Sequence, residues 1–273
     1  MSADSETGER GLGRSGALAA LRADPARTAI LSDVDGTLAP IVERPEQAAV
    51  PARAAELLAM LSERFGLVGC ISGRRALEAR RLVGVEGIAY AGNHGFELLL
   101  PGEAEPALDP TIEGREGEAG EFLAGLDGEL EAAGLRREDK GPIQALHWRG
   151  AGDQRAAEAR AHEIAADAGR AGLEPRWGRK VLELRPVGGG GKDAAVAALL
   201  AGTGVSAAAY AGDDRTDLDA CRRLRELGDE GRLATTVCVG VASDEGPPEL
   251  LEEADLIVAG PEGWLDLLAE LAE

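Results

Sequence analysis

Two aspartates, Asp33 and Asp35, stand one residue apart at the end of an apolar run and are followed at once by Gly36 and Thr37. Burying a carboxylate is costly unless a cation or hydrogen-bond donors meet it. The pair is therefore either a solvated turn or a chemical site. An isolated Asp-x-Asp-Gly is more typical of turns and calcium loops, so the rest of the chain has to distinguish the two interpretations.

Other polar residues also follow apolar runs or begin helical segments: Ser72, Lys192, Asp213, Asp214 and Asp217. Five carboxylates cannot share one pocket without a cation, because like charges at that range would force several of them to take up protons. Oxygen ligands with room for water favour Mg²⁺, whereas the three histidines and three cysteines lack the spacing of zinc ligands. We therefore expect Mg²⁺ as the cofactor.

A metal held by carboxylates beside a lysine suits the hydrolysis of a phosphate monoester, which enzymes can accelerate by about 10²¹-fold. In this interpretation Asp33 attacks phosphorus and forms an aspartyl-phosphate. Asp35 protonates the departing alkoxide and then activates water. Lys192 and the hydroxyl group of Ser72 contact the phosphoryl oxygens. We expect these four residues to be catalytic.

Lysine is rare in this chain and occurs only at Lys140, Lys180 and Lys192, while arginine supplies the other cations. Lys192 begins a predicted helix, where the helix dipole favours anions. A lysine at that position therefore indicates an anionic partner.

Apolar strand-like runs alternate with amphipathic helical segments in the first and last thirds of the chain. Strands are predicted at residues 28–32, 67–71, 88–91, 207–211, 235–239 and 256–258, and helices at residues 51–64, 74–83, 192–201, 217–227 and 264–271. This alternation predicts a parallel, doubly wound sheet, which places ligands at the carboxyl ends of its strands.

The middle of the chain has a different pattern. We predict a hairpin arm at residues 96–100, helices at 116–133 and 153–171, and strands at 143–148 and 181–184. The polar alternation of these strands indicates a sheet covered on one face. A separate inserted lobe is therefore expected.

The polar motifs carry a family resemblance. DVDGT at residues 33–37, ISGR at 71–74, Lys192 and GDDRTD at 212–217 resemble, in this order, the four motifs of the haloacid dehalogenase (HAD) superfamily of phosphatases. A narrower resemblance, to the trehalose-6-phosphate phosphatase family, is carried by AGNHG at 91–95, EDK at 138–140, ALHWR at 145–149 and VLELRP at 181–186. Together the motifs cover about residues 28–260.

The resemblance implies an α/β fold with a Rossmann-like parallel-sheet HAD core and an inserted α+β cap. We expect the core at residues 27–95 and 187–273 and the cap at 96–186. A mobile N-terminal tail is expected at 1–26, running into a short helix near residues 17–22.

The resemblance also implies site residues. Mg²⁺ would be held by Asp33, the backbone carbonyl of Asp35, and Asp213, with Asp214 and Asp217 as supporting acidic residues. The cap would bind sugar hydroxyls through Glu138, Lys140 and Glu183. The remaining expected substrate contacts are Gly36, Thr37, Gly73, Arg74, Asn93 and His94.

The implied activity is hydrolysis of trehalose 6-phosphate to trehalose and phosphate. Three alternatives remain open at this point. The substrate could instead be sucrose phosphate, mannosylglycerate phosphate or a glucosylglycerol phosphate. The chain could be a catalytically silent sugar-phosphate sensor, or a phospho-accepting signalling receiver, although a receiver has no use for Asp35 or for a lobe of this size.

Composition restricts the partners and the location. With 29 basic and 49 acidic residues and a net charge of -20, the chain is a poor match for nucleic acid or an anionic membrane. Three cysteines, two of them in apolar runs, favour a reducing compartment. We expect a cytoplasmic monomer that binds a small sugar phosphate, with a trehalose-phosphate synthase as the candidate partner for functional coupling.

Overall fold

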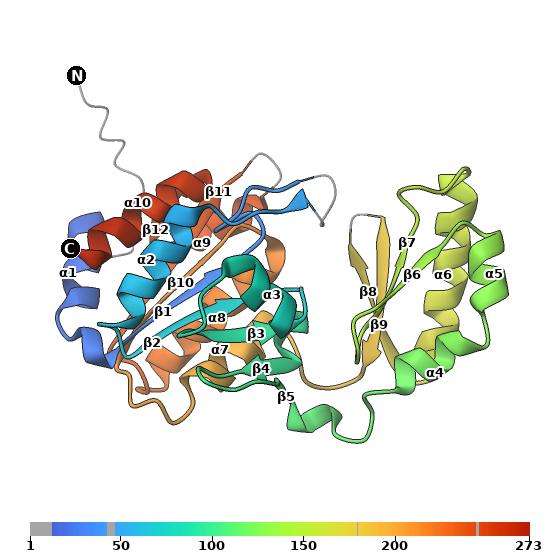
Figure 1. Ribbon diagram of the computed structural model, residues 1–273, viewed down its shortest axis with the longest axis horizontal. Helices are drawn as coiled ribbons and strands as arrows, with labels where there is room; N and C mark the ends of the chain where they lie inside the picture. Colours follow the sequence, from blue (N-terminus) through green and yellow to red (C-terminus); the bar gives the residue numbers. More distant parts are fainter. Residues whose placement is uncertain (1–12, 43–46, 179, 244–245) are drawn as a thin grey trace. The chain divides into compact units, whose positions relative to one another are not determined.

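The computed structural model describes residues 13–42, 47–178, 180–243 and 246–273 (Figure 1). The chain divides into two compact units. One comprises Met1–Ala107 and Gly190–Glu273, and the other comprises Leu108–Gly189. Part of the predicted tail, residues 1–12, lies outside the described residues.

The first unit is built on an eight-stranded sheet with the strand order β12-β11-β10-β1-β2-β3-β4-β5. The strands are β1 (Thr28–Asp33), β2 (Leu67–Ile71), β3 (Ala89–Gly92), β4 (Glu97–Leu99), β5 (Ala107–Leu108), β10 (Ala207–Gly212), β11 (Thr235–Ala242) and β12 (Leu256–Ala259). All neighbours from β12 to β3 are parallel. The predicted parallel, doubly wound sheet is confirmed.

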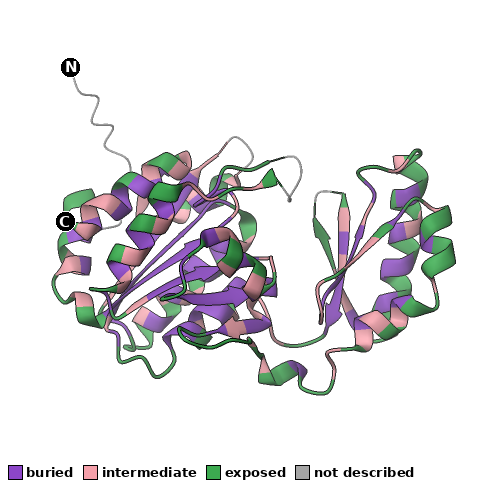
Figure 2. Ribbon diagram, in the orientation of Figure 1, coloured by how far each residue is buried: buried purple, intermediate pink, exposed green. Residues whose placement is uncertain are grey.

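Helices cover both faces of this sheet. One face carries α1 (Arg14–Arg22), α2 (Ala52–Ser62), α3 (Ala76–Val83) and α10 (Gly260–Ala272), and the other carries α7 (Lys192–Leu200), α8 (Arg215–Asp229) and α9 (Pro248–Glu253). In β1, Ile30 packs into the first apolar cluster and Leu31 into the second. The strand is buried throughout (Figure 2), which explains its uninterrupted apolar sequence.

One segment differs from the sequence predictions for the first unit. The segment 96–100 is not an arm of the inserted lobe, because β4 pairs antiparallel with β3 and Leu99 lies in the core cluster. The second unit accordingly begins at Leu108 rather than at residue 96. The short helix expected near residues 17–22 of the predicted tail is confirmed as α1, which begins at Arg14, and its Leu18 and Leu21 are buried in the same cluster.

The second unit has a four-stranded antiparallel sheet with the order β6-β7-β9-β8. Its strands are β6 (Arg136–Asp139), β7 (Gln144–His147), β8 (Leu173–Gly178) and β9 (Val181–Pro186), and its helices are α4 (Glu118–Ala124), α5 (Asp127–Ala132) and α6 (Gln154–Arg170). The prediction of one helix over 116–133 is wrong, because the chain leaves the helix at Gly125 and starts again at Asp127.

The helices of the second unit pack on one face of its sheet, where they bury Leu146 of β7 and Leu182 of β9. Side chains alternate along a strand, so the neighbours of these leucines in β7 and β9 point to the opposite face of the sheet. The register places Glu138, Ala145 and Glu183 in one row across β6, β7 and β9. This row therefore lies on the face of the sheet that the helices leave open.

Candidate active site

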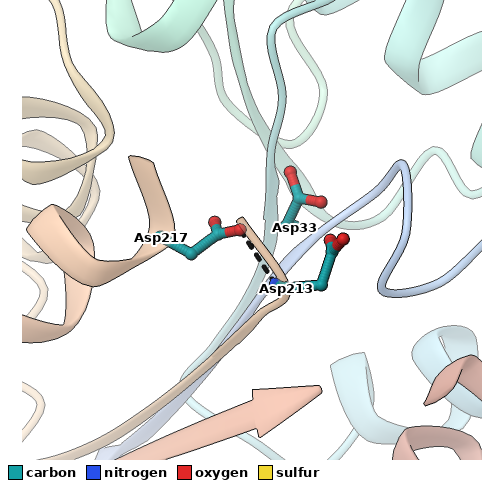
Figure 3. A group of neighbouring side chains, drawn as sticks. All are labelled: Asp33, Asp213 and Asp217. Carbon is teal, nitrogen blue, oxygen red and sulfur yellow. Dashed lines mark hydrogen bonds between the residues drawn. The ribbon is translucent and has the colours of Figure 1, made fainter. Parts of the chain in front are cut away.

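The first unit gathers three carboxylates at the carboxyl ends of its central strands. Asp33 is the last residue of β1, Asp213 follows β10, and Asp217 lies in the first turn of α8. Their ligand oxygens lie within 4.8 Å of one another and all three residues are buried (Figure 3). Parallel pairing of β1 with β10 brings these strand ends together, although 180 residues separate them in the chain.

Lys192, the first residue of α7, is the cation of this cluster. Its Nζ lies 2.7 Å from Oδ1 of Asp33 and 2.6 Å from Oδ1 of Asp217, and the residue is buried. Burial alone would lower the pKa of Lys192, but the carboxylates of Asp217 and Asp33 outweigh it and hold the pKa well above its usual value. Lys192 therefore stays charged beside Asp33 and Asp217.

Asp217 is saturated with hydrogen-bond donors. Oδ1 accepts from Lys192 and from the hydroxyl group of Tyr210, and Oδ2 accepts from the backbone nitrogens of Asp213 and Asp214 at 2.9 Å each. Asp214 in turn caps α8 through a reciprocal capping box with Asp217. Asp217 is thus fitted to position the loop and Lys192, and it has little left to offer a metal.

Asp33 and Asp213 are the carboxylates fitted to hold a cation. Oδ1 of Asp213 accepts from the hydroxyl group of Thr37 at 3.0 Å, so Thr37 contacts this carboxylate. Burial, reinforced by the charge of Asp217, raises the pKa of Asp213 to about 7, and burial also raises the pKa of Asp33 despite Lys192. Desolvated carboxylates with oxygen-only donors fit Mg²⁺, which would compensate their charge.

Gly36 has to be glycine for this arrangement. Its φ is +98°, and a Cβ at this position would lie 2.2 Å from Oδ2 of Asp213. We expect Gly36→Ala to displace the Asp213 carboxylate. The kcat of the phosphate release expected from the sequence should fall by about 10²-fold, with a matching loss of Mg²⁺ affinity. The matched control is Gly102→Ala, because Gly102 has φ +85° but no heavy atom of the described residues lies within 4 Å of its Cβ position. Steady-state kinetics with Mg²⁺ titration tests this, and equal effects of both substitutions would contradict it.

The raised pKa of Asp213 predicts competition between protons and Mg²⁺. The ordinary pKa is 3.8, so the metal-free protein gains stability from this group below pH 3.8 and loses it as the pH rises through about 7. Mg²⁺ needs the ionised form and should bind about tenfold more weakly at pH 6 than at pH 8. Melting temperatures over a Mg²⁺ titration at both pH values measure this. Equal affinities at pH 6 and pH 8 would contradict a proton-linked Mg²⁺ ligand at Asp213.

Asp35 lies in the loop after β1 and is paired with Arg74. Its carboxylate accepts from Nε and Nη2 of Arg74 at 2.7 Å each. The buried Ser72, in the loop after β2, accepts through its Oγ from the backbone nitrogen of Arg74 at 3.1 Å. The structure thus brings Asp35, Ser72 and Arg74 together, as two neighbouring strand ends of the sheet require.

The loop with Gly73 and the loop with Asn93 and His94 are held against each other. The backbone nitrogens of His94 and Asn93 donate to the carbonyls of Ser72 and Arg74, at 3.0 and 2.7 Å. A Cβ at Gly73 would meet the His94 ring at 2.6 Å, so glycine is required for this contact.

The buried Glu97, which sequence reasoning missed, supports these loops. Its carboxylate accepts from Nδ2 of Asn93 at 2.9 Å and from the backbone nitrogen of Ala76 at 2.7 Å. One of the carboxylate's oxygens therefore holds the loop after β3, and the other holds the N-terminus of α3. The signal in the sequence was a single carboxylate beside two leucines in Glu97–Leu99. A carboxylate buried with such neighbours needs hydrogen-bond donors, which suggests a supporting role.

In the second unit, the three residues predicted to bind sugar hydroxyls share one face of the sheet: Glu138, Lys140 and Glu183. Nζ of Lys140 lies 2.8 Å from Oε1 of Glu183, and both side chains are largely buried. Glu138 stands in the same row as Glu183, on the far side of Ala145. The row presents acceptors and a donor together, which is the chemistry a polyol needs.

Comparisons with known proteins give the family of the chain. The chain matches the family model "Trehalose-phosphatase" over residues 31–246. It is 33% identical over 250 residues to "Probable trehalose-phosphate phosphatase 9" of Oryza sativa subsp. japonica, covering 80% of this chain and 64% of the relative. It is also 33% identical over 213 residues to the trehalose-phosphate phosphatase of Mycolicibacterium paratuberculosis, covering 72% of this chain and 51% of the relative. The chain thus spans less than two thirds of the length of these relatives.

Solved structures share the fold. The C-terminal domain of C. albicans trehalose-6-phosphate phosphatase superposes with a TM-score of 0.77 at 22% identity, covering 96% of this chain and 97% of that chain. A haloacid dehalogenase-like hydrolase from Bacteroides thetaiotaomicron superposes with a TM-score of 0.65 at 14% identity, covering 89% and 98%. The fold is that of the HAD-like hydrolases, and the match to the family model shows that the chain belongs to the trehalose-phosphatase family.

Proposed function

We propose that this chain is a Mg²⁺-dependent phosphatase that hydrolyses trehalose 6-phosphate to trehalose and phosphate. The observation that carries the proposal is the cluster of Asp33, Lys192 and Asp213, in which a buried carboxylate at a strand end lies beside a fixed ammonium group and a second carboxylate. This arrangement supports attack on a phosphoryl group. The substrate is proposed from the family and from the names of its relatives.

In the first step a carboxylate oxygen of Asp33 attacks phosphorus, and the bond from phosphorus to the sugar oxygen breaks. Asp35 gives its proton to the departing oxygen, so that trehalose leaves neutral and Asp33 carries the phosphoryl group. Lys192 neutralises charge on the phosphoryl oxygens. Mg²⁺, held by Asp33, Asp213 and the backbone carbonyl of Asp35, would supply further charge neutralisation when bound.

In the second step water attacks the phosphoryl group, Asp35 takes up a proton from that water, and the bond from phosphorus to Asp33 breaks. Both Asp35 oxygens accept from Arg74 in the structure, so in this proposal at least one of these two hydrogen bonds opens before Asp35 passes a proton to the departing oxygen. In the proposal the Arg74 guanidinium group then contacts the phosphate, which is the substrate contact expected from the sequence. The ion pair described above is therefore a resting arrangement in this proposal.

The second unit is proposed to recognise the sugar through Glu138, Lys140 and Glu183. In the proposal the remaining expectations also stand: a small-molecule substrate, a cytoplasmic monomer, and a trehalose-phosphate synthase as the candidate for functional coupling. None of the described helices combines the length and the apolar composition needed to cross a bilayer.

A substrate panel tests the proposal. Phosphate release is measured with Mg²⁺ from trehalose 6-phosphate, sucrose 6-phosphate, glucosylglycerol phosphate, mannosylglycerate phosphate and glucose 6-phosphate, with Asp33→Asn as the blank. We expect trehalose 6-phosphate to have the highest kcat/KM, and Glu183→Gln to reduce that preference. A higher kcat/KM for another member would change the substrate and keep the mechanism. Binding without turnover across the panel would indicate a sensor instead of an enzyme.

A further inference from the structure

We propose that His147 is a positioning residue that fixes the carboxylate of Glu138 for recognition of sugar hydroxyls. The inference rests on the proposed function, because it assigns to Glu138 a role in binding the sugar. His147 ends β7, beside the row of Glu138, Ala145 and Glu183 on the open face of the second unit's sheet.

The contact between the two residues is direct. Nε2 of His147 lies 2.7 Å from Oε2 of Glu138, and the side chains are 24% and 38% exposed. Glu138 pairs with Ala145 in the antiparallel register, so His147 is its diagonal neighbour on the same face. Ala145 has no polar side-chain atom, and His147 supplies the donor from β7 that Ala145 cannot.

The hydrogen bond has a definite direction. An ionised carboxylate only accepts, so the proton of the pair lies on Nε2 of His147. This bond lowers the pKa of Glu138 against the effect of burial, with help from the charge of Lys140. Glu138 is thus kept as an acceptor, which suits a hydroxyl donor on a sugar.

Lys140 acts on Glu183 as His147 acts on Glu138. The Lys140 ammonium group lies 2.8 Å from Oε1 of Glu183, so each carboxylate in the row is held by a donor from a different segment. Fixing an acceptor before binding reduces the conformational entropy lost when the sugar arrives. Without His147, Glu138 would lose this donor, and more of its ordering would be left to the substrate.

The test compares two substitutions of His147 on two substrates. His147→Leu removes the donor, and His147→Gln keeps an amide donor. Turnover of trehalose 6-phosphate requires recognition of the sugar as well as the phosphate chemistry. p-Nitrophenyl phosphate carries no sugar and requires only the phosphate chemistry. We expect His147→Leu to raise KM for trehalose 6-phosphate about tenfold, the equivalent of one hydrogen bond of about 1.4 kcal/mol, and to leave p-nitrophenyl phosphate turnover unchanged. His147→Gln should recover part of the loss.

Two controls separate positioning from a structural role. His162 lies on α6, stacked against Trp177 with a ring-centroid separation of 4.2 Å, on the helix side of the sheet. His162→Leu should therefore leave KM for trehalose 6-phosphate unchanged. The double variant Glu138→Leu with His147→Leu should have no larger KM than Glu138→Leu alone, because His147 acts only through the carboxylate that Glu138→Leu removes.

The outcomes are distinct. Unchanged KM in His147→Leu, or equal losses on both substrates, would overturn the inference and leave the proposed function standing. A wild-type protein that turns over p-nitrophenyl phosphate but not trehalose 6-phosphate would overturn the proposed substrate, and the inference with it. A loss confined to the sugar phosphate and absent in His162→Leu supports the inference.

Discussion

Asp33→Asn is expected to lower phosphate release from trehalose 6-phosphate by about 10⁴-fold or more, because it removes the proposed nucleophile. Asparagine keeps the shape of the side chain and its Oδ1, which accepts from Lys192 at 2.7 Å in the wild-type protein. Burial raises the pKa of Asp33, so the wild-type carboxylate destabilises the fold when ionised. We therefore expect the variant to be inactive but no less stable than the wild type.

The matched control for this substitution is Asp219→Asn. Asp219 lies on α8 with a side chain that is 59% exposed, outside the buried cluster. Kinetics and thermal melts of both variants separate chemistry from folding. If Asp33→Asn kept a tenth of the wild-type kcat, Asp33 could not be the nucleophile.

Lys192→Met is expected to have the largest effect on stability. It would leave Asp33 and Asp217 without their shared cation, although their side chains are only 6% and 0% exposed. Breaking a buried ion pair on one side costs about 3–5 kcal/mol, which corresponds to a fall of roughly 10 °C in the melting temperature. Activity should fall as well, because the phosphoryl oxygens lose their fixed positive charge.

Lys180→Met provides the control for the lysine substitution. Lys180 is exposed and its ammonium group donates to Oε1 of Gln154 at 2.7 Å, at the surface of the second unit. Its replacement should change the melting temperature by less than about 2 °C. Equal destabilisation by the two substitutions would contradict the account of Lys192 as the shared partner of buried carboxylates.

The strands of the central sheet could be predicted because they are buried on both faces. Leu67–Ile71 matches its predicted range, and the end of Thr28–Asp33 differs by one residue. An apolar run between turn residues is a strong signal when no polar face interrupts it.

The missed strands lack that signal. Arg136–Asp139 contains only charged residues and is stabilised as an edge strand by pairing with Gln144–His147. Leu173–Gly178, the other edge of the small sheet, contains Pro175, which the edge position tolerates. Neither pairing can be read from local sequence, because each depends on a partner strand elsewhere in the chain.

The site was predictable where residue type and strand position coincide. Asp33, Lys192 and Asp213 follow from carboxylates and a rare lysine at strand ends or a helix start, and the structure brings them into one cluster. Tyr210 was missed because its hydroxyl group acts on Asp217 from within a buried strand, where an aromatic residue is usually apolar packing. Its occurrence as one of only two tyrosines was the available signal.

The central claim is that Asp33 carries the phosphoryl group during turnover. The most direct measurement is to mix the wild-type protein with trehalose 6-phosphate and Mg²⁺, quench with acid within one turnover, and locate the phosphoryl group by peptide mass mapping. The account predicts modification of the peptide that contains Asp33, absent in Asp33→Asn and absent without Mg²⁺. Rapid phosphate release with no modified peptide, or a phosphoryl group on any other residue, would contradict it.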